Sequence, residues 1–409
     1  MEQETPYAWA RLAAAIALST LGGVGMWSVI VVLPAVQAEF GVARGSASLP
    51  YTLTMLGFAV GGVGMGRWAD RSGIVRPLLG GAAALSTGFV LAGLSGSLWQ
   101  FALIQGVLIG MLGCSASFAP LLADTSLWFT RRRGIAVALC ASGNYLAGTV
   151  WPPMVQHFTD LYGWRPTYIG IGLFCAATML PLSFAMRRAP PVQRLAAAGT
   201  VGRGGTGLSP GVVQGLLVVA GLACCVAMAM PQVHIVAYCG DLGYGVTRGA
   251  QMLSLMLGFG IISRIGSGFL ADRIGGLPTL LAGSVLQGVA LLLYLVFDGL
   301  TSLYVISALF GLFQGGIVPS YAIVVREFFP PQEAGTRVGL VLMATLVGMA
   351  LGGWLSGAIF DLTGSYHAAF VNGVLWNALN GTVVSFLLWR RGRPLLTRRQ
   401  VPAGPGQAA

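Results

Sequence analysis

Long apolar stretches separated by short polar segments run through the whole sequence. Twelve of these stretches hold about 20 predominantly apolar residues or more, the length that an α-helix needs to cross a hydrocarbon core of ~30 Å. They centre on residues 10–34, 49–66, 77–97, 101–127, 134–156, 166–186, 211–238, 249–270, 277–297, 302–325, 338–359 and 368–389. The pattern therefore predicts an all-α integral membrane protein with twelve transmembrane helices.

One polar segment is much longer than the others. The stretch "RRAPPVQRLAAAGTVGRGGTGLSP", residues 187–210, is rich in arginine, proline and glycine and is typical of a linker. It divides the predicted helices six and six. We therefore expect an N-terminal half at 1–186, a cytoplasmic linker at 187–210, a C-terminal half at 211–389 and a cytoplasmic tail at 390–409.

An internal repeat supports this division. The segment "MLGFAVGGVGMGRWADRSG" at 55–73 resembles "MLGFGIISRIGSGFLADRIG" at 256–275, and Asp70 and Asp272 hold corresponding places. Eight residues before each aspartate, one copy has Gly62 and the other has Arg264. Two parallel six-helix halves with a substrate site between them are typical of secondary transporters.

Composition and charge agree with a membrane protein. Hydrophobic residues make up 56% of the chain and charged residues only 9%, against roughly 25% charged residues in soluble domains. There is no lysine, and the formal charge of +11 comes from 23 arginines. With both termini in the cytoplasm, 19 of these arginines fall on the inner side and three on the outer side, which is the positive-inside asymmetry. The charge thus indicates contact with anionic lipid headgroups and not with nucleic acid.

Several kinds of chemistry have no signature in the sequence. The six cysteines lie in or beside apolar segments without metal-ligand spacing. There is no GxxxxGK[ST] loop for ATP, no HExxH helix and no GxSxG elbow. We therefore expect no metal site, no cofactor and no enzymatic activity.

Arg264 is the one charged residue well inside an apolar stretch. A charge at the bilayer centre costs at least ~2.5 kcal/mol, so an intramembrane arginine suggests a functional role. It could extend toward the cytoplasm or brace Asp272, since eight helical residues rise only about 12 Å. Alternatively, its planar guanidinium could bind a carboxylate in a central cavity.

The repeated loops carry a family resemblance. Gly66-x-x-x-Asp70-Arg71-x-Gly73 and its second copy, Gly268-x-x-x-Asp272-Arg273-x-Gly275, resemble the loop motif of the major facilitator superfamily. Four further segments, at 39–48, 128–148, 234–243 and 357–370, resemble the monocarboxylate-porter family and its bacterial oxalate/formate-antiporter-like relatives. The resemblance spans nearly the whole chain and implies the major facilitator fold.

The resemblance also implies roles for particular residues. Arg264 would bind the substrate carboxylate, and Asp70, Arg71, Asp272 and Arg273 would form charge pairs of a cytoplasmic gate. Phe118, Asn144 and Gln314 lie near positions that face the substrate in the family. Two positions depart from the pattern: mammalian members carry an aspartate where this chain has Gly260 and a first-helix lysine where it has Leu33. A lysine–aspartate pair therefore cannot couple protons here.

The other polar residues of the helices allow more than one interpretation. His234 could carry a coupled proton, because histidine titrates nearest neutral pH, or it could be a hydrogen-bonded packing residue. Asp124 lies seven residues before Arg131 and is expected to pair with the 131–133 arginine cluster. Glu327 and Asp361 are expected to be structural groups at helix ends.

These observations predict a monomeric secondary transporter of a small organic monoanion in a bacterial inner membrane or plasma membrane. Arg264 would bind the carboxylate, Leu33 and Phe118 would enclose the carbon skeleton, and Asn144, Gln314 and His234 would add polar contacts. A proton gradient or an exchanged anion would supply energy. Efflux of hydrophobic compounds, for which Arg264 has no evident use, and a non-transporting sensor are the alternatives.

Overall fold

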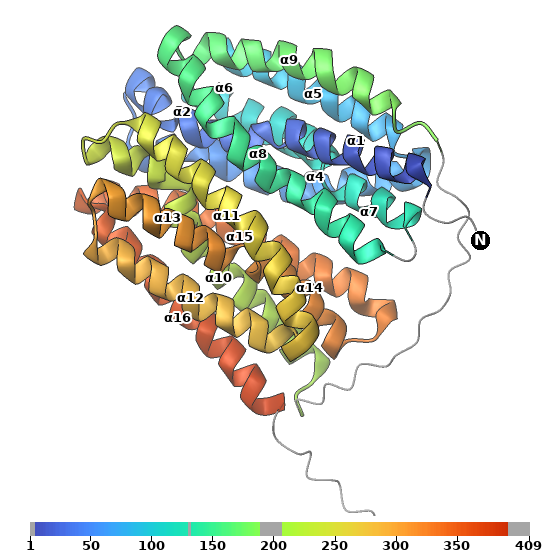
Figure 1. Cartoon of the computed structure of the whole chain (residues 1–409). Coiled ribbons are helices and arrows are strands. Elements are labelled where there is room, and N and C mark those ends of the chain that lie inside the picture. The colour runs from blue at the N-terminus through green and yellow to red at the C-terminus, as the bar shows by residue number, and fades with distance from the viewer. Residues whose placement is uncertain (1–4, 130–131, 189–206, 392–409) are drawn as a thin grey trace, which may run out of the picture.

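The computed structural model describes residues 5–129, 132–188 and 207–391 (Figure 1). Most of the predicted linker, residues 189–206, and most of the predicted tail, residues 392–409, lie outside the described residues. The described chain is built of helices, as expected where no water is available to satisfy backbone N–H and C=O groups. Helix α16 continues through Arg390 to Arg391, slightly beyond the predicted end at 389.

The first part of the chain forms six long helical segments, three of which are interrupted. Their elements are α1 (Pro6–Gly22), α2 (Val24–Phe40), α3 (Arg44–Ala47), α4 (Leu49–Ser72), α5 (Val75–Gly93), α6 (Leu98–Ile104), the π-helix η1 (Gln105–Cys114), α7 (Ala119–Trp128), α8 (Arg133–Tyr162) and α9 (Trp164–Phe184). The second part also forms six: α10 (Pro210–Asp241), α11 (Val246–Ile274), α12 (Gly276–Val296), α13 (Leu300–Gln314) followed by α14 (Ile317–Phe328), α15 (Pro331–Thr363) and α16 (Tyr366–Arg391).

Eleven of these segments are long and apolar enough to cross a membrane. The remaining one, α8, has 30 residues and packs against α1, α2 and α11. Counting α8, the described chain has the twelve long segments that the apolar pattern predicts.

The helices gather into two groups that meet along one interface. Figure 1 shows α1–α9, coloured blue to green, on one side and α10–α16, coloured yellow-green to red, on the other. Helices α2, α3, α4 and α8 of the first group pack against α10, α11 and α15 of the second. We call the bundle end that carries Arg44 the Arg44 end, and the end that carries the Asp70 and Asp272 loops the Asp70 end.

The two copies of the repeat end their helices in the same way. Gly73 follows α4 with φ 78° and ψ 165°, and Gly275 follows α11 with φ 90° and ψ 166°. Each glycine N–H donates to the alanine carbonyl four residues earlier, Ala69 or Ala271. Because L side chains rarely adopt a positive φ, glycine is required at both positions.

Glycine also permits close approach between helices. A Cβ added at Gly311 in α13 would lie 1.9 Å from the backbone oxygen of Met256 in α11. The break between α13 and α14 lies beside the same helix, where a Cβ at Gly315 would lie 2.4 Å from the backbone oxygen of Gly260. Small residues thus hold α11 and α13 together by backbone contact.

Gly311→Ala should therefore destabilise the protein, because neither backbone can move away from the added methyl group without disturbing its own helix. Overpacking of this kind costs about 1–3 kcal/mol. Thermal unfolding in detergent should show a lower Tm. The matched control is Gly381→Ala in α16, where an added Cβ meets nothing within 4 Å. Equal Tm values for the two variants would contradict the contact.

Candidate functional site

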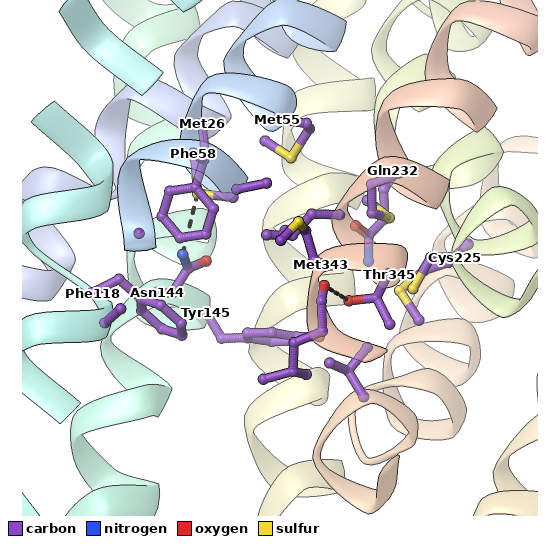
Figure 2. A pocket seen from close by; sticks show the side chains of 18 of the residues that line it. Met26, Met55, Phe58, Phe118, Asn144, Tyr145, Cys225, Gln232, Met343 and Thr345 are labelled. Atoms are coloured by element: carbon purple, nitrogen blue, oxygen red, sulfur yellow. Dashed lines mark hydrogen bonds between the residues drawn. The ribbon is translucent and has the colours of Figure 1, made fainter. Parts of the chain in front are cut away.

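A cavity of about 370 Å³ lies between the two helix groups (Figure 2). Its wall comes from α2, α4, α8, α10, α11, α14, α15 and the start of α7. The lining residues are Met26, Trp27, Tyr51, Met55, Phe58, Ala59, Gly62, Val63, Phe118, Ala119, Asn144, Tyr145, Cys225, Met228, Gln232, Arg264, Val318, Gly339, Leu342, Met343, Thr345, Leu346 and Met349. Both halves of the chain therefore contribute to a single site.

The wall of the cavity is mostly apolar and soft. Five methionines and five aromatic side chains are among the lining residues. Methionine is flexible and polarizable, so it adapts to irregular apolar shapes. Among the described residues, Arg264 is the only charged side chain of the lining, and no aspartate or glutamate belongs to it. The cavity thus combines a hydrophobic surface with one fixed positive charge.

Arg264 reaches from α11 across the interface to α8. Its Cζ lies 3.9 Å from the ring centroid of Tyr145, and its Nη1 donates a 3.3 Å hydrogen bond to the carbonyl oxygen of Ala141. Its Nε is buried without a hydrogen-bond acceptor, and within the described chain no carboxylate pairs with it. The guanidinium is therefore positioned by an aromatic face and retains donor capacity along its edge.

Tyr145 occupies the space beside Gly260, one helical turn before Arg264. A Cβ at position 260 would lie 2.4 Å from a ring carbon of Tyr145. An aspartate at this position, as in the mammalian members that the sequence resembles, would require the tyrosine ring to shift. In this chain the arginine instead makes a cation–π contact with Tyr145, worth about 0.5–2 kcal/mol.

Two other predicted residues line the cavity from the first half. Asn144 Nδ2 lies 3.3 Å from Met26 Sδ, and the Asn144 carbonyl oxygen accepts a 3.1 Å hydrogen bond from Trp27 Nε1. Phe118 immediately precedes α7 and packs against Phe58, with ring centroids 5.7 Å apart. The structure thus brings Arg264, Asn144 and Phe118 together around one cavity.

Three predicted residues do not line it. Leu33 is packed in the core of α2 with 2% of its surface exposed. Gln314 is completely buried near the end of α13, and neither end of its amide has a partner among the described residues. His234 is completely buried in α10, and its hydrogen bonds lead toward the Arg44 end.

At the Arg44 end, polar contacts join the two halves. Arg44 donates to both carboxylate oxygens of Asp241, at 2.7 and 3.2 Å, and to the Tyr366 hydroxyl at 2.8 Å. Asp361 accepts the backbone N–H groups of Arg44 and Gly45, at 2.7 and 2.6 Å. A carboxylate of the second half thus caps the first turn of α3 in the first half, a favourable position for negative charge.

His234 connects this cluster to the helix that lines the cavity. One ring nitrogen, Nε2, lies 2.8 Å from the Gly353 carbonyl oxygen, so it must carry the proton of that hydrogen bond. In the neutral ring, Nδ1 then accepts the 3.0 Å hydrogen bond from the Tyr366 hydroxyl, which itself accepts from Arg44. The contacts form one directed chain: Arg44 to Tyr366 to His234 to Gly353.

The contact of Asp361 with the first half of the chain was not predicted from the sequence. The sequence suggested only that Asp361 is a structural group at a helix end. Glu327 matches that suggestion, since it accepts from the Gly276 backbone N–H at 2.7 Å and from Arg391 at 2.5 Å. The expected pairing of Asp124 with the 131–133 cluster stays a prediction, because Arg131 and the Arg133 side chain lie outside the described residues. Asp124 pairs with Arg11 in α1, at 3.0 Å. Its partner lies 113 residues away, so helical spacing alone could not identify it.

The Asp70 end shows no comparable closure. Asp70, Arg71, Asp272 and Arg273 are exposed, and none has an ion-pair or hydrogen-bond partner in the described part of the chain. Among the described residues, the polar contacts between the halves lie from Arg264 toward the Arg44 end. The cytoplasmic gate suggested for these four residues therefore stays a prediction, and they do not pair in this conformation.

Comparisons with known proteins agree with this architecture. The family model described as Major Facilitator Superfamily matches residues 15–302 and 267–408. Monocarboxylate transporter 13 of Bos taurus is 29% identical over 340 residues, and the match covers 80% of this chain and 75% of that protein. The Rattus norvegicus protein of the same name is 30% identical over 305 residues, and the match covers 72% of this chain and 69% of that protein. A bacterial homolog to the human lysosomal transporter Spinster, inward-facing and occupied, matches with a TM-score of 0.70 at 17% identity, covering 95% of this chain and 96% of that one.

The contacts at the Arg44 end generate a test of closure. A cysteine at Ser48, which is buried in this cluster, should react slowly with a membrane-impermeant maleimide. Asp361→Asn leaves one acceptor oxygen where two are needed, so it should weaken the contact between α3 and α15 and raise the labelling rate several-fold. Glu39→Gln is the control, because Glu39 pairs with Arg165 inside one half. Equal labelling rates of Ser48→Cys with and without Asp361→Asn would show that this carboxylate does not hold the Arg44 end closed.

Proposed function

Because the chain belongs to the monocarboxylate-porter family of the major facilitator superfamily, we propose that it moves a small organic monoanion across the membrane by alternating access. Membership makes it a multi-pass membrane transporter and not an enzyme. The relatives are named as monocarboxylate transporters, and a carboxylate substrate is the corresponding proposal for this chain.

The observation that carries the proposal is the unpaired charge of Arg264. This guanidinium is half-buried in an apolar cavity, where a cation without a counterion is costly. Tyr145 contacts its face and leaves its edge available. A substrate carboxylate bound along that edge would supply the missing negative charge through two parallel hydrogen bonds.

The rest of the wall suggests the kind of carbon skeleton. Methionine and aromatic side chains surround the arginine, whereas Asn144, Gln232 and Thr345 are among the few polar side chains there. A hydrocarbon skeleton with an aromatic or branched group would bury its surface against these residues. A short hydroxy acid would leave most of the apolar wall uncovered, so we favour a bulky monocarboxylate.

The proposed orientation in the membrane indicates which side of the transporter is closed in this conformation. With both termini in the cytoplasm, the Arg44 end faces outward and is closed, and the Asp70 end faces inward. Transport then requires that Arg44 and Asp361 release their partners on the opposite half. Asp70, Arg71, Asp272 and Arg273 would pair when the inner end closes in turn.

His234 is our candidate for proton coupling. It lies in α10 between the cavity residue Gln232 and the Arg44 cluster, and its Nδ1 is the acceptor that a proton would occupy. An added proton there would prevent Tyr366 from donating to the ring and would place a cation near Arg44, facing Asp241 and Asp361. Exchange of anions without protons remains the competing mode of coupling.

Efflux of hydrophobic compounds is the second candidate function. The apolar wall, with five methionines, favours it, since such surfaces accommodate varied ligands. The two functions differ in their dependence on charge. Transport of neutral or cationic compounds would gain nothing from Arg264, whereas transport of a carboxylate depends on it.

Substitutions of Arg264 test the substrate-binding role. Arg264→Ala removes charge and donors, and Arg264→Lys keeps charge but loses the planar fork. Losing one partner of a buried charge pair costs about 2–5 kcal/mol, so affinity should fall roughly thirtyfold or more.

The assay is uptake into proteoliposomes with a panel of radiolabelled monocarboxylates, aromatic and aliphatic. Arg248→Ala is the control, since Arg248 is an exposed arginine of the same helix. Wild-type affinity in Arg264→Ala for the transported acid would remove Arg264 from the binding site. Uptake of neutral compounds that survives the substitution would favour the efflux function.

His234→Gln separates proton coupling from substrate exchange. Glutamine can still hydrogen-bond, but it does not titrate near neutral pH. Accumulation driven by a pH gradient should be lost, while counterflow exchange at equal pH should continue. The exposed His367 provides the control variant His367→Gln. Gradient-driven accumulation at the wild-type level would show that His234 only packs.

A further inference from the structure

We propose that Cys224 and Cys225 form a two-thiol site in the cavity wall that binds trivalent arsenicals carrying one organic substituent. The two residues are adjacent in α10, and their Sγ atoms lie 3.7 Å apart. Cys225 lines the cavity, on the same side as Thr345 (Figure 2). The proposal depends on the cavity and not on the identity of the transported anion.

The backbone decides which sulfur chemistry the pair can perform. Adjacent Cα atoms are about 3.8 Å apart, whereas the Cα atoms of a disulfide are usually about 4.4–6.8 Å apart. A disulfide would thus require a break in α10, which continues through both residues. A bridging atom between the sulfurs avoids this distortion, because each sulfur bonds to that atom and not to the other sulfur.

The site offers only two thiol ligands, and this number restricts which atom can bridge the two sulfurs. A structural zinc site takes four protein ligands, and the described residues contain no group of three or more His, Cys, Asp or Glu side chains arranged for a metal. Arsenic(III) with one organic substituent needs only two further bonds. Its preference for sulfur matches a thiol pair in apolar surroundings.

The reaction proceeds without any change of oxidation state. A hydrated arsenical, R–As(OH)2, forms one As–S bond with each thiol as its two As–O bonds break. Each thiol proton leaves with one hydroxide as water, so two water molecules are released and arsenic stays trivalent. Two bonds to one chain make the adduct more persistent than attachment to a single cysteine.

The position of the pair connects binding to transport. α10 packs closely on α15 at this level, where a Cβ at Gly348 would lie 3.0 Å from Cys225 Cβ and 2.4 Å from the Leu222 carbonyl oxygen. An arsenic substituent therefore has no room between these helices and must project into the cavity. Occupation of the pair should accordingly block substrate binding.

The test uses the purified full-length chain and phenylarsine oxide as the probe. Intact-protein mass spectrometry should show one bridging phenylarsenic per chain, removed by a dithiol such as 2,3-dimercaptopropanol. Cys224→Ser and Cys225→Ser should each lower adduct occupancy about tenfold or more, because one thiol alone cannot chelate. Cys224 does not line the cavity, so its variant keeps the test valid should Cys225→Ser fold poorly.

Cys175→Ser is the matched control, since Cys175 is an equally buried thiol in the other half. An adduct that persists in Cys224→Ser and disappears in Cys175→Ser overturns the proposal, as does the absence of any adduct. Inhibition of uptake, measured against each variant's own untreated rate, should follow adduct occupancy. Adduct formation is measured without any transport assay. The proposal of a thiol site and the proposal of a monocarboxylate substrate are therefore tested independently.

Discussion

The absence of water in the hydrocarbon core is the constraint on which this structure depends. Every backbone N–H and C=O must be bonded within the protein there, so the chain crosses the membrane only as helix. Lipid supplies little hydrophobic drive for helices to associate, and close packing takes its place. The backbone contacts of Gly311 with Met256 and of Gly315 with Gly260 are the result. They hold α11 against α13 and fix the position of Arg264.

The same constraint makes the charges informative. Asp124 is neutralised by Arg11 at 3.0 Å, and Glu327 by Arg391 and a backbone N–H. Arg264 differs from these, because an aromatic ring and one carbonyl oxygen contact it and no carboxylate does so in the part of the chain that the structure describes. A protein that needed this arginine only for stability would gain by pairing it. The unpaired guanidinium is therefore the basis of our proposal that the cavity binds an anion from outside the chain.

The contacts between the halves are distributed unevenly. At the Arg44 end, two carboxylates of the second half hold the start of α3, and Tyr366 links Arg44 to His234. At the Asp70 end, the charged residues of the repeated loops are exposed. Among the described residues, polar contacts join the two related halves at the Arg44 end, and halves joined in this way can rock about the cavity between them. Charged contacts suit a reversible closure, since water can replace the partners when the end opens.

Apolar length and an isolated charge are local features, so the sequence was enough to predict the membrane class and the number of spans and to single out Arg264 as a candidate. The repeat similarly placed Gly73 and Gly275 at corresponding positions of two loops, and family resemblance directed attention to Asn144 and Phe118. Which distant side chains meet became clear from the packed helices alone: Arg44 meets Asp241, 197 residues away, Arg11 meets Asp124, and Arg264 meets Tyr145. Leu33 and Gln314, which do not line the cavity, show the same limit of sequence analysis. Helical periodicity indicates which residues share one face of a helix, but not what that face contacts. Those contacts depend on how the helices rotate and pack against one another, which no local pattern specifies.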